Sequence, residues 1–106
     1  MSNKMAVEIQ YFNDCPNSSK MIGRVKEAMK EFNGKIHYLE TLVEDKLSAE
    51  KVKFRGSPTL LINGEDFENL SEPISPNLSC RFYHNGLPTI EEIKNIIQTK
   101  LQEDQT

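Results

Sequence analysis

The sequence predicts an α/β fold in which a mixed central sheet of about four strands carries helices on both faces. The first observation is that strand-type alternation over residues 6–12 gives way to helix-type spacing over residues 16–32. The second is that an apolar run at 59–62 leads straight into Asn63-Gly64, a strong signal for a tight hairpin turn. A length of 106 residues with 37% hydrophobic side chains fits one domain, residues 1–106, built around one small core.

The first half of the chain predicts a strand, a helix, a second strand and a short helix. Residues 6–12 alternate, with Val7 and Ile9 on one face of the strand. The apolar residues of 16–32 recur at helical spacing, and Asn33-Gly34 then ends the helix. A strand at 35–39, running on toward residue 43, and a short helix within 44–53 follow. Leu47 and Val52 are the expected anchors of that short helix.

The second half predicts a hairpin and a closing helix. The strand at 59–62 turns back at 65–67, and an irregular loop fills 68–79. Residues 80–83 follow as a short edge strand, with Phe82 expected in the core. Thr89 and Glu92 have the spacing of a capping box at the start of a helix that runs to about residue 101. A strand–helix–strand unit requires parallel pairing, so the hairpin makes the sheet mixed.

Composition and charge exclude several classes of function. Thirteen basic and sixteen acidic side chains give a net charge of −3, whereas proteins that bind nucleic acid usually carry a basic excess. No apolar run approaches the roughly 20 residues of a membrane helix. The amino-terminal segment lacks the pattern of an export signal, which favours the cytosol, where thiols are kept reduced. No cofactor and no oligomeric state is indicated.

Cysteine usage points to reactivity rather than to a disulfide scaffold. The chain has only Cys15 and Cys80, and with His37 and His84 they do not match the spacing of a zinc site. Cys15 precedes Pro16, and proline is favoured at the first helical position. Cys15 is then the N-cap, where free N–H groups and the helix dipole lower a thiol pKa from about 8.5.

Two neighbours bear on this cysteine. The Ser18 hydroxyl is expected as a further donor to the Cys15 sulfur, whereas a negative charge on Asp14 would oppose a thiolate. The alternative to a reactive Cys15 is that it is a buried structural residue.

Two motifs together resemble the thioredoxin fold. Cys15-Pro16-Asn17-Ser18 opens the first helix after a strand, and Gly56-Ser57-Pro58-Thr59 leads into the apolar strand about 40 residues later. The spelling C-P-x-S resembles the monothiol form of the glutaredoxin motif. With the later C-R-x-Y at 80–83, the chain is similar to a small thioredoxin-like family related to alkylmercury lyases.

The resemblance implies a substrate site around these motifs. Pro58 would follow a cis peptide bond beside Cys15, and the backbone of Ser57 would be free to bind an extended thiol substrate. Pro16 and Thr59 would complete that surface. Because position 18 is serine, the dithiol cycle of thioredoxin cannot run within the motif. The basic residue that usually precedes a glutaredoxin motif is absent, so glutathione is not indicated as the specific partner.

The sequence leaves three possible roles open for Cys80. It could resolve a mixed disulfide on Cys15, it could share a soft metal ion with Cys15, or it could be a half-buried strand residue. Arg81 would favour a thiolate at Cys80, and His84 could serve as a base or lie in an exposed turn.

These readings lead to one leading function and two alternatives. The leading one is a thiol–disulfide oxidoreductase that acts on a low-molecular-weight or protein thiol or disulfide, with Cys15 attacking and Cys80 resolving. The alternatives are a thiol trap for soft metal or organomercurial compounds and a redox-inactive interaction module of the same fold.

Overall fold

The computed structural model describes residues 4–13, 15–76, 78–83 and 85–104. It confirms the mixed α/β class. In chain order the elements are β1 (Met5–Tyr11), α1 (Asn17–Met29), the 3₁₀ turn η1 (Lys30–Phe32), β2 (Ile36–Leu42), α2 (Lys46–Val52), β3 (Thr59–Ile62), β4 (Glu65–Asp66) and α3 (Ile90–Asp104).

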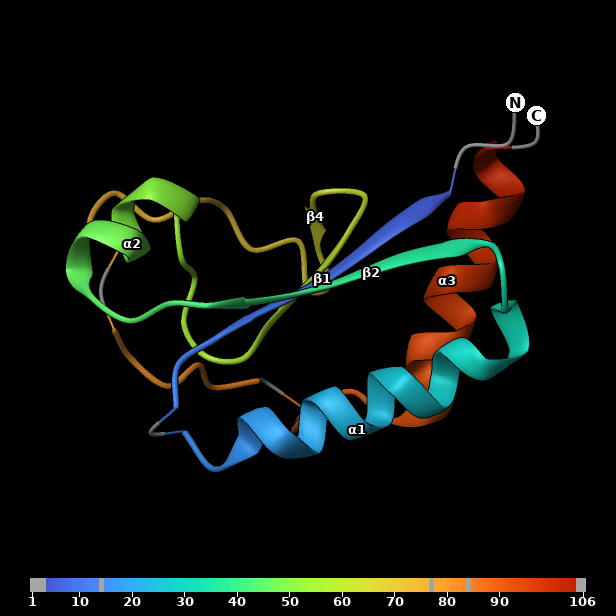
Figure 1. The fold of residues 1–106 in the computed structure, drawn as a ribbon, viewed down its shortest axis with the longest axis horizontal. Coiled ribbons are helices and arrows are strands. Elements are labelled where there is room, and N and C mark those ends of the chain that lie inside the picture. Colours follow the sequence, from blue (N-terminus) through green and yellow to red (C-terminus); the bar gives the residue numbers. More distant parts are fainter. Residues whose placement is uncertain (1–3, 14, 77, 84, 105–106) are drawn as a thin grey trace.

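The four strands lie in the order β2-β1-β3-β4 (Figure 1). β1 and β2 are parallel, while β3 is antiparallel to β1 and β4 is antiparallel to β3. Parallel neighbours need a crossover connection, which α1 supplies, whereas the Asn63-Gly64 turn suffices for the hairpin. The strand order therefore puts β1 in the interior of the sheet and brings its carboxyl end close to the start of β3.

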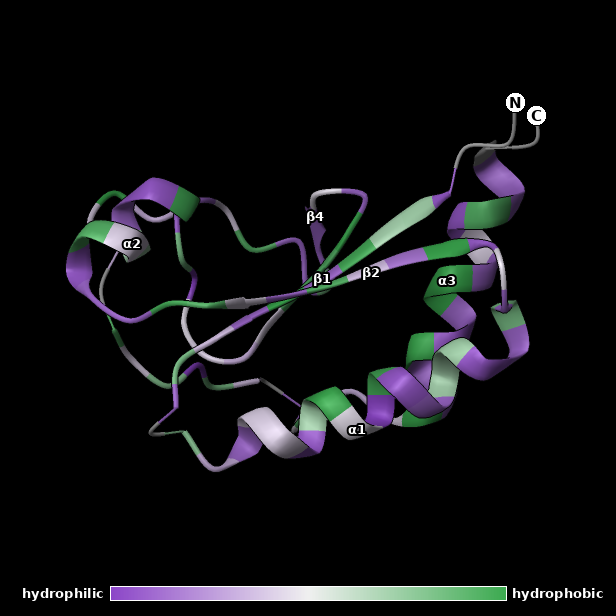
Figure 2. Ribbon diagram, viewed as in Figure 1, coloured by the Kyte–Doolittle hydropathy of each residue, from purple (hydrophilic) through white to green (hydrophobic). Residues whose placement is uncertain are grey.

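The main core lies where α1 and α3 pack on one face of the sheet. Apolar and polar stretches alternate along both helices (Figure 2), as an amphipathic helix requires. Burial of these apolar side chains supplies the main driving force for this arrangement. The buried members of the cluster are Met5, Val7, Ile9, Met21, Val25, Ala28, Phe32, Leu60, Ile62, Tyr83, Ile93 and Ile97.

A second, smaller cluster holds α2. It consists of Val43, Ala49 and Phe54, with Phe12 and Val52 packed against it. Figure 1 places α2 at the end of the molecule away from α3. The cluster fixes the chain just after β1, where the turn that carries Cys15 begins.

Three details differ from the sequence prediction. Leu47 was expected to anchor α2, but it is exposed, and Ala49 takes that place. Residues 80–83 form no strand; Cys80 makes only an isolated parallel bridge to Ser57, and Phe82 is 84% exposed. Residues 80–83 are held by polar contacts of Ser57 and Asp66 that hydrophobic patterning does not report. In α2 the small side chain of Ala49 faces the apolar cluster, and the larger Leu47 does not. No helix within the described ranges is long and apolar enough to cross a membrane.

The capping box that opens α3 is present. The backbone N–H of Glu92 donates to Thr89 Oγ1 at 3.1 Å, and the N–H of Thr89 donates to Glu92 Oε1 at 2.9 Å. Replacing Thr89 by alanine should lower the free energy of unfolding by about 1 kcal/mol, because one helix-end donor loses its acceptor. Urea unfolding of Thr89→Ala measures this. Thr99→Ala, an exposed position in the same helix, is the matched control and should change stability little; equal losses in both variants would contradict the capping role.

Candidate functional site

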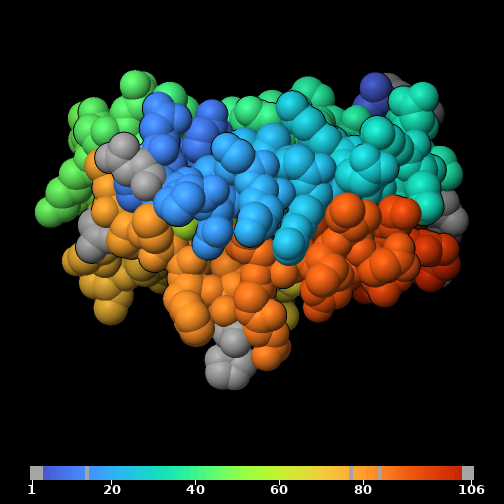
Figure 3. All heavy atoms as spheres, turned by 90° about the horizontal axis from the view of Figure 1, so that it is seen from below, coloured from blue at the N-terminus to red at the C-terminus, as the bar shows by residue number. Residues whose placement is uncertain are grey.

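The two cysteines form a disulfide. Cys15, in the turn before α1, is bonded to Cys80, which lies 65 positions later in the chain, and their Cα atoms are 5.8 Å apart. In Figure 3 the start of α1 and the segment around residue 80 lie side by side on the surface. The folded chain therefore brings together the two residues that the sequence analysis marked for their reactivity.

Cys15 lies just before α1, but it is not the N-cap residue that the sequence predicted: Pro16 is the N-cap, and the helix begins at Asn17. Pro16 already has helical dihedral angles (φ −64°, ψ −22°), and the N–H of Ser18 donates to the Cys15 carbonyl at 3.1 Å. Cys15 is only 3% exposed, so the prediction that its sulfur is open to solvent is wrong for the oxidised protein. It belongs to neither apolar cluster, and its N–H donates to the Phe12 carbonyl at 3.5 Å.

A buried pair of hydroxyl groups joins the start of α1 to the turn before β3. Ser18 Oγ and Ser57 Oγ are 2.9 Å apart, and Ser18 Oγ donates to the Phe12 carbonyl at 3.5 Å. The N–H of Phe12 donates to Ser57 Oγ at 3.1 Å. The Ser18 hydroxyl was expected to donate to the Cys15 sulfur, but it is used here instead. Its role in the oxidised protein is to hold the Cys15 turn against the Ser57 turn.

The peptide bond between Ser57 and Pro58 is cis, as the resemblance implied. The backbone of Ser57, however, is not free for a substrate. Its N–H donates to the Ser79 carbonyl and its carbonyl accepts from the Arg81 N–H, both at 2.8 Å. Residues 79 and 81 of the same chain therefore use the backbone hydrogen-bonding groups of Ser57 that an extended substrate was expected to use.

Of the other residues expected to bind substrate, Pro58 and Thr59 are buried and Pro16 is exposed. Thr59 is fully buried; its hydroxyl donates to the Gly56 carbonyl at 2.5 Å and accepts from Arg81 at 3.4 Å. The Pro58 carbonyl accepts from the Tyr83 hydroxyl at 2.7 Å. Both therefore support the turn from inside, while Pro16 is exposed beside Cys15.

Arg81 is the buried anchor of the Cys80 segment. Its guanidinium makes two bonds to the Asp66 carboxylate, at 2.5 and 2.7 Å, and lies over the Tyr83 ring at 4.4 Å. The carboxylate also accepts from the N–H groups of Glu68 and Leu70. The C-R-x-Y pattern thus has a structural meaning: Arg81 and Tyr83 hold the chain on either side of residue 82.

The electrostatics of this anchor follow from burial and hydrogen bonding. Burial alone would raise the pKa of Asp66, but the bonds from Arg81 and from the Leu70 N–H outweigh it and hold that pKa below its usual value. Burial raises the pKa of the Tyr83 hydroxyl well above its usual range. Arg81 was expected to favour a thiolate at Cys80, but its guanidinium forms ion pairs with Asp66 and Glu68. Asp66 was not singled out in the sequence, where it is one acidic residue after a hairpin turn.

Gly56 lets the Cys80 segment approach this closely. Its φ is +104°, and a Cβ there would lie 2.9 Å from Arg81 Cβ and 3.2 Å from Arg81 Cα. We expect Gly56→Ala to lower the free energy of unfolding by about 2–3 kcal/mol, since it adds both backbone strain and a clash. Gly34→Ala is the matched control, because Gly34 has φ +84° but open space around it, and it should cost clearly less. Denaturant unfolding compares the two, and equal losses would show that the contact with Arg81 contributes nothing.

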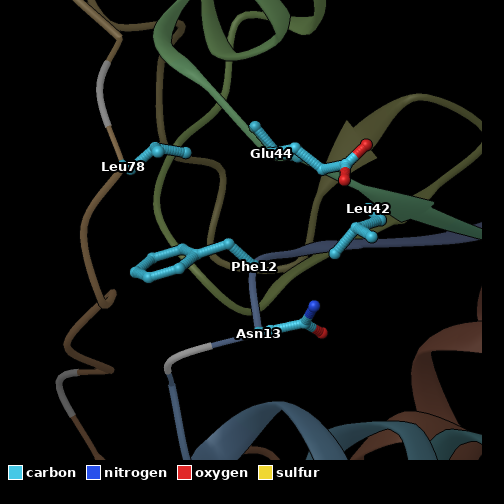
Figure 4. Close-up of a pocket in the computed structure, with 6 residues that line it drawn as sticks. Phe12, Asn13, Leu42, Glu44 and Leu78 are labelled. Atoms are coloured by element: carbon cyan, nitrogen blue, oxygen red, sulfur yellow. The ribbon is translucent and has the colours of Figure 1, made fainter.

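A pocket with a volume of about 440 Å³ lies between the chain after β1, the end of β2 and the segment that leads to Cys80. Figure 4 shows Phe12 and Asn13 from the chain after β1, Leu42 and Glu44 from the end of β2, and Leu78 from the segment that leads to Cys80. Phe12 lies three positions before Cys15 and Leu78 lies two positions before Cys80, so both chain segments that lead to the disulfide contribute to the lining of this pocket.

Two residues that the sequence placed near the cysteines cannot be assigned a position in the site. Asp14 and His84 lie outside the described residues. Within the described part of the chain, no group of three or more His, Cys, Asp or Glu side chains could hold a metal ion.

Comparison with known proteins supports the fold alone. No protein-family model matches the chain, and no curated relative matches it. One solved structure, described as "Structure of a malarial protein", is similar with a TM-score of 0.60 and 13% sequence identity. The similarity covers 92% of this chain and 97% of that one. The arrangement of helices and strands is thus shared with that protein over nearly its whole length.

Proposed function

We propose that this protein is a thiol–disulfide redox protein of thioredoxin-like fold that works by opening and closing the Cys15–Cys80 disulfide. The observation that carries the proposal is this bond itself, which joins a cysteine at the start of α1 to a cysteine anchored beside the cis Ser57–Pro58 turn. The strand order β2-β1-β3-β4, with α1 as the crossover, supports the thioredoxin-like assignment. So does the Cys-Pro start of α1.

The proposed reaction is a two-electron exchange. The reduced protein and a substrate disulfide give the oxidised protein and two substrate thiols, and the reverse reaction oxidises two thiols to a disulfide. No cofactor is needed, because both electrons reside in the sulfur atoms. The substrate is a low-molecular-weight or protein thiol or disulfide, and the place of action is the cytosol, where a pair that opens and closes is redox-active rather than structural.

The start of α1 favours the reduced form of Cys15 as a thiolate. The amino-terminal end of a helix carries a partial positive charge, which stabilises an anion at this point. The buried Ser18 and Ser57 hydroxyls keep the turn in place, so this geometry is preformed rather than assembled on reaction.

A redox titration tests the proposal. The folded protein is equilibrated in buffers of reduced and oxidised dithiothreitol, and its free thiols are tagged with a maleimide that shifts mobility on a gel. We expect Cys15 and Cys80 to titrate together as one two-electron transition and the protein to reduce 2-hydroxyethyl disulfide catalytically. Cys15→Ser and Cys80→Ser should each lose catalysis by at least about a hundredfold, since neither can close the bond. A disulfide that stays closed in the folded protein in excess dithiothreitol would contradict the proposal.

The two alternatives predict different results. A trap for soft metal or organomercurial compounds would also use both sulfurs, and it predicts a one-to-one complex of the reduced protein with a mercuric compound that either serine variant loses. A redox-inactive interaction module predicts that neither serine variant changes any exchange rate. The same titration therefore separates the redox function from that module.

A further inference from the structure

We propose that thiol–disulfide exchange takes place at Cys80, with Cys15 as the leaving and resolving thiolate. This inference rests on the proposed redox function and reverses the roles that the sequence analysis assigned to the two cysteines. It follows from three features of the structure: the different exposure of the two residues, the anchoring of the Cys80 segment, and the position of Cys15 on the helix.

The first feature is access. An attacking thiolate must reach one sulfur from the side opposite its partner, so the reacting sulfur has to be open to solvent. Cys15 is 3% exposed, and the contact between the Ser18 and Ser57 hydroxyls holds the start of α1 against the turn before β3. Cys80 is exposed, and its neighbour Phe82 is exposed as well. Cys80 is therefore the sulfur that an incoming thiol meets first.

The second feature is that the Cys80 segment is held by contacts other than the disulfide. Two backbone hydrogen bonds tie residues 79 and 81 to Ser57, and buried Arg81 is bonded to Asp66. The Tyr83 hydroxyl bonds the Pro58 carbonyl. When the disulfide opens, these contacts remain, and Cys80 stays within reach of Cys15. The same contacts block the backbone of Ser57, so an external peptide cannot line up there to present a disulfide to Cys15.

The third feature concerns the leaving group. Exchange is faster when the departing thiolate is more stable. Cys15 departs beside the amino-terminal end of α1, where the helix dipole favours a negative charge. No comparable helix end lies at Cys80, which sits on an isolated bridge to Ser57. Attack at Cys80 thus releases the better leaving group.

The steps balance in both directions. In oxidation of the protein, the Cys80 thiolate attacks a substrate disulfide and one substrate thiolate leaves. The Cys15 thiolate then attacks the Cys80 sulfur of the mixed disulfide, and the second substrate thiolate leaves. In reduction, a substrate thiolate attacks the Cys80 sulfur and expels the Cys15 thiolate; a second substrate thiolate then attacks the substrate sulfur and frees Cys80. Each full cycle moves two electrons and leaves the protein chain otherwise unchanged.

The decisive experiment uses the wild-type oxidised protein. It is mixed briefly with 2-mercaptoethanol, quenched with acid to stop exchange, and then alkylated in denaturant with N-ethylmaleimide. Trypsin places the two cysteines in separate peptides, residues 5–20 and residues 56–81. Mass spectrometry should find at least tenfold more 2-mercaptoethanol adduct on peptide 56–81, with the maleimide on peptide 5–20. Equal labelling, or an excess on peptide 5–20, would overturn the assignment.

Two single-cysteine variants give an independent readout. Reduced Cys15→Ser, which keeps Cys80, should react with 5,5′-dithiobis(2-nitrobenzoate) at least tenfold faster than reduced Cys80→Ser, which keeps the buried Cys15. The difference should vanish in guanidinium chloride, where both thiols are exposed. A faster reaction of Cys80→Ser in the folded state would overturn the assignment. If instead no thiol opens the folded wild-type disulfide, the proposed redox function itself fails, so the two failures are distinguishable.

Discussion

Asp66→Asn is expected to lower the free energy of unfolding by about 3 kcal/mol, because it removes the closest counter-charge of the buried Arg81 guanidinium and leaves only the longer contact to Glu68, at 3.3 Å. Both side chains of this pair are almost completely buried, at 2% and 1% exposed. The carboxylate also accepts two backbone N–H groups from the start of the loop that follows β4. Removal of its charge therefore weakens three partners at once, and all three lie within the part of the fold that positions Cys80.

Denaturant unfolding measures this loss, and two further variants make the measurement specific. Lys30→Ala removes an exposed ion pair with Glu27 and should cost less than about 1 kcal/mol. The double variant Asp66→Leu with Arg81→Met replaces the ion pair by apolar side chains and should recover most of the stability. No fully buried charge is then left unpaired, because the Glu68 side chain, which also contacts Arg81, is 26% exposed and can be solvated. A loss for Asp66→Asn no larger than that for Lys30→Ala would contradict the anchoring role.

The Arg81–Asp66 ion pair should make the free energy of unfolding depend on pH in the acidic range. The pKa of Asp66 is lower in the folded protein than its usual value near 4, so the unfolded chain binds the proton more readily. The stabilising contribution is therefore complete above about pH 4 and is lost as the pH falls below that value. Unfolding midpoints measured from neutral pH to about pH 2 should fall less steeply for Asp66→Asn than for the wild type.

Reduction of the Cys15–Cys80 disulfide is expected to cause the second large loss in the free energy of unfolding. Cys15 and Cys80 are 65 positions apart, and a cross-link over a loop of that length stabilises a protein by about 4 kcal/mol, chiefly by restricting the unfolded chain. Unfolding in the presence of dithiothreitol should show this loss. The variant Cys15→Ser with Cys80→Ser should match the reduced wild type and should not respond to dithiothreitol.

The reduced protein is expected to stay folded. Small domains have free energies of unfolding of about 5–15 kcal/mol, and the Arg81 anchor and the two clusters are untouched by reduction. Circular dichroism at room temperature should therefore change little on reduction while the unfolding midpoint falls. A complete loss of structure would show that the disulfide is a structural cross-link and would contradict a redox cycle.

Much of the fold was predicted from the sequence because its elements are specified by neighbouring residues. Cys15-Pro16 marks the start of α1, Asn63-Gly64 specifies the hairpin, and the Thr89 capping box opens α3. Each of these signals depends on backbone preferences or hydrogen bonds over a few residues, which the local sequence states directly. The errors at Leu47 and Phe82 fall in short segments, where one or two apolar side chains define no periodicity.

The chemistry of the site was decided by the tertiary structure. The sequence marked Cys15, Ser57 and Cys80, yet it left open whether the two cysteines meet and expected Ser57 to be free. The pairing of Arg81 with Asp66, which closes the segment over Ser57, joins residues 15 positions apart through a hairpin and a loop. Burial and long-range pairing depend on the path of the whole chain, so only the folded structure shows which sulfur is covered and which one solvent can reach.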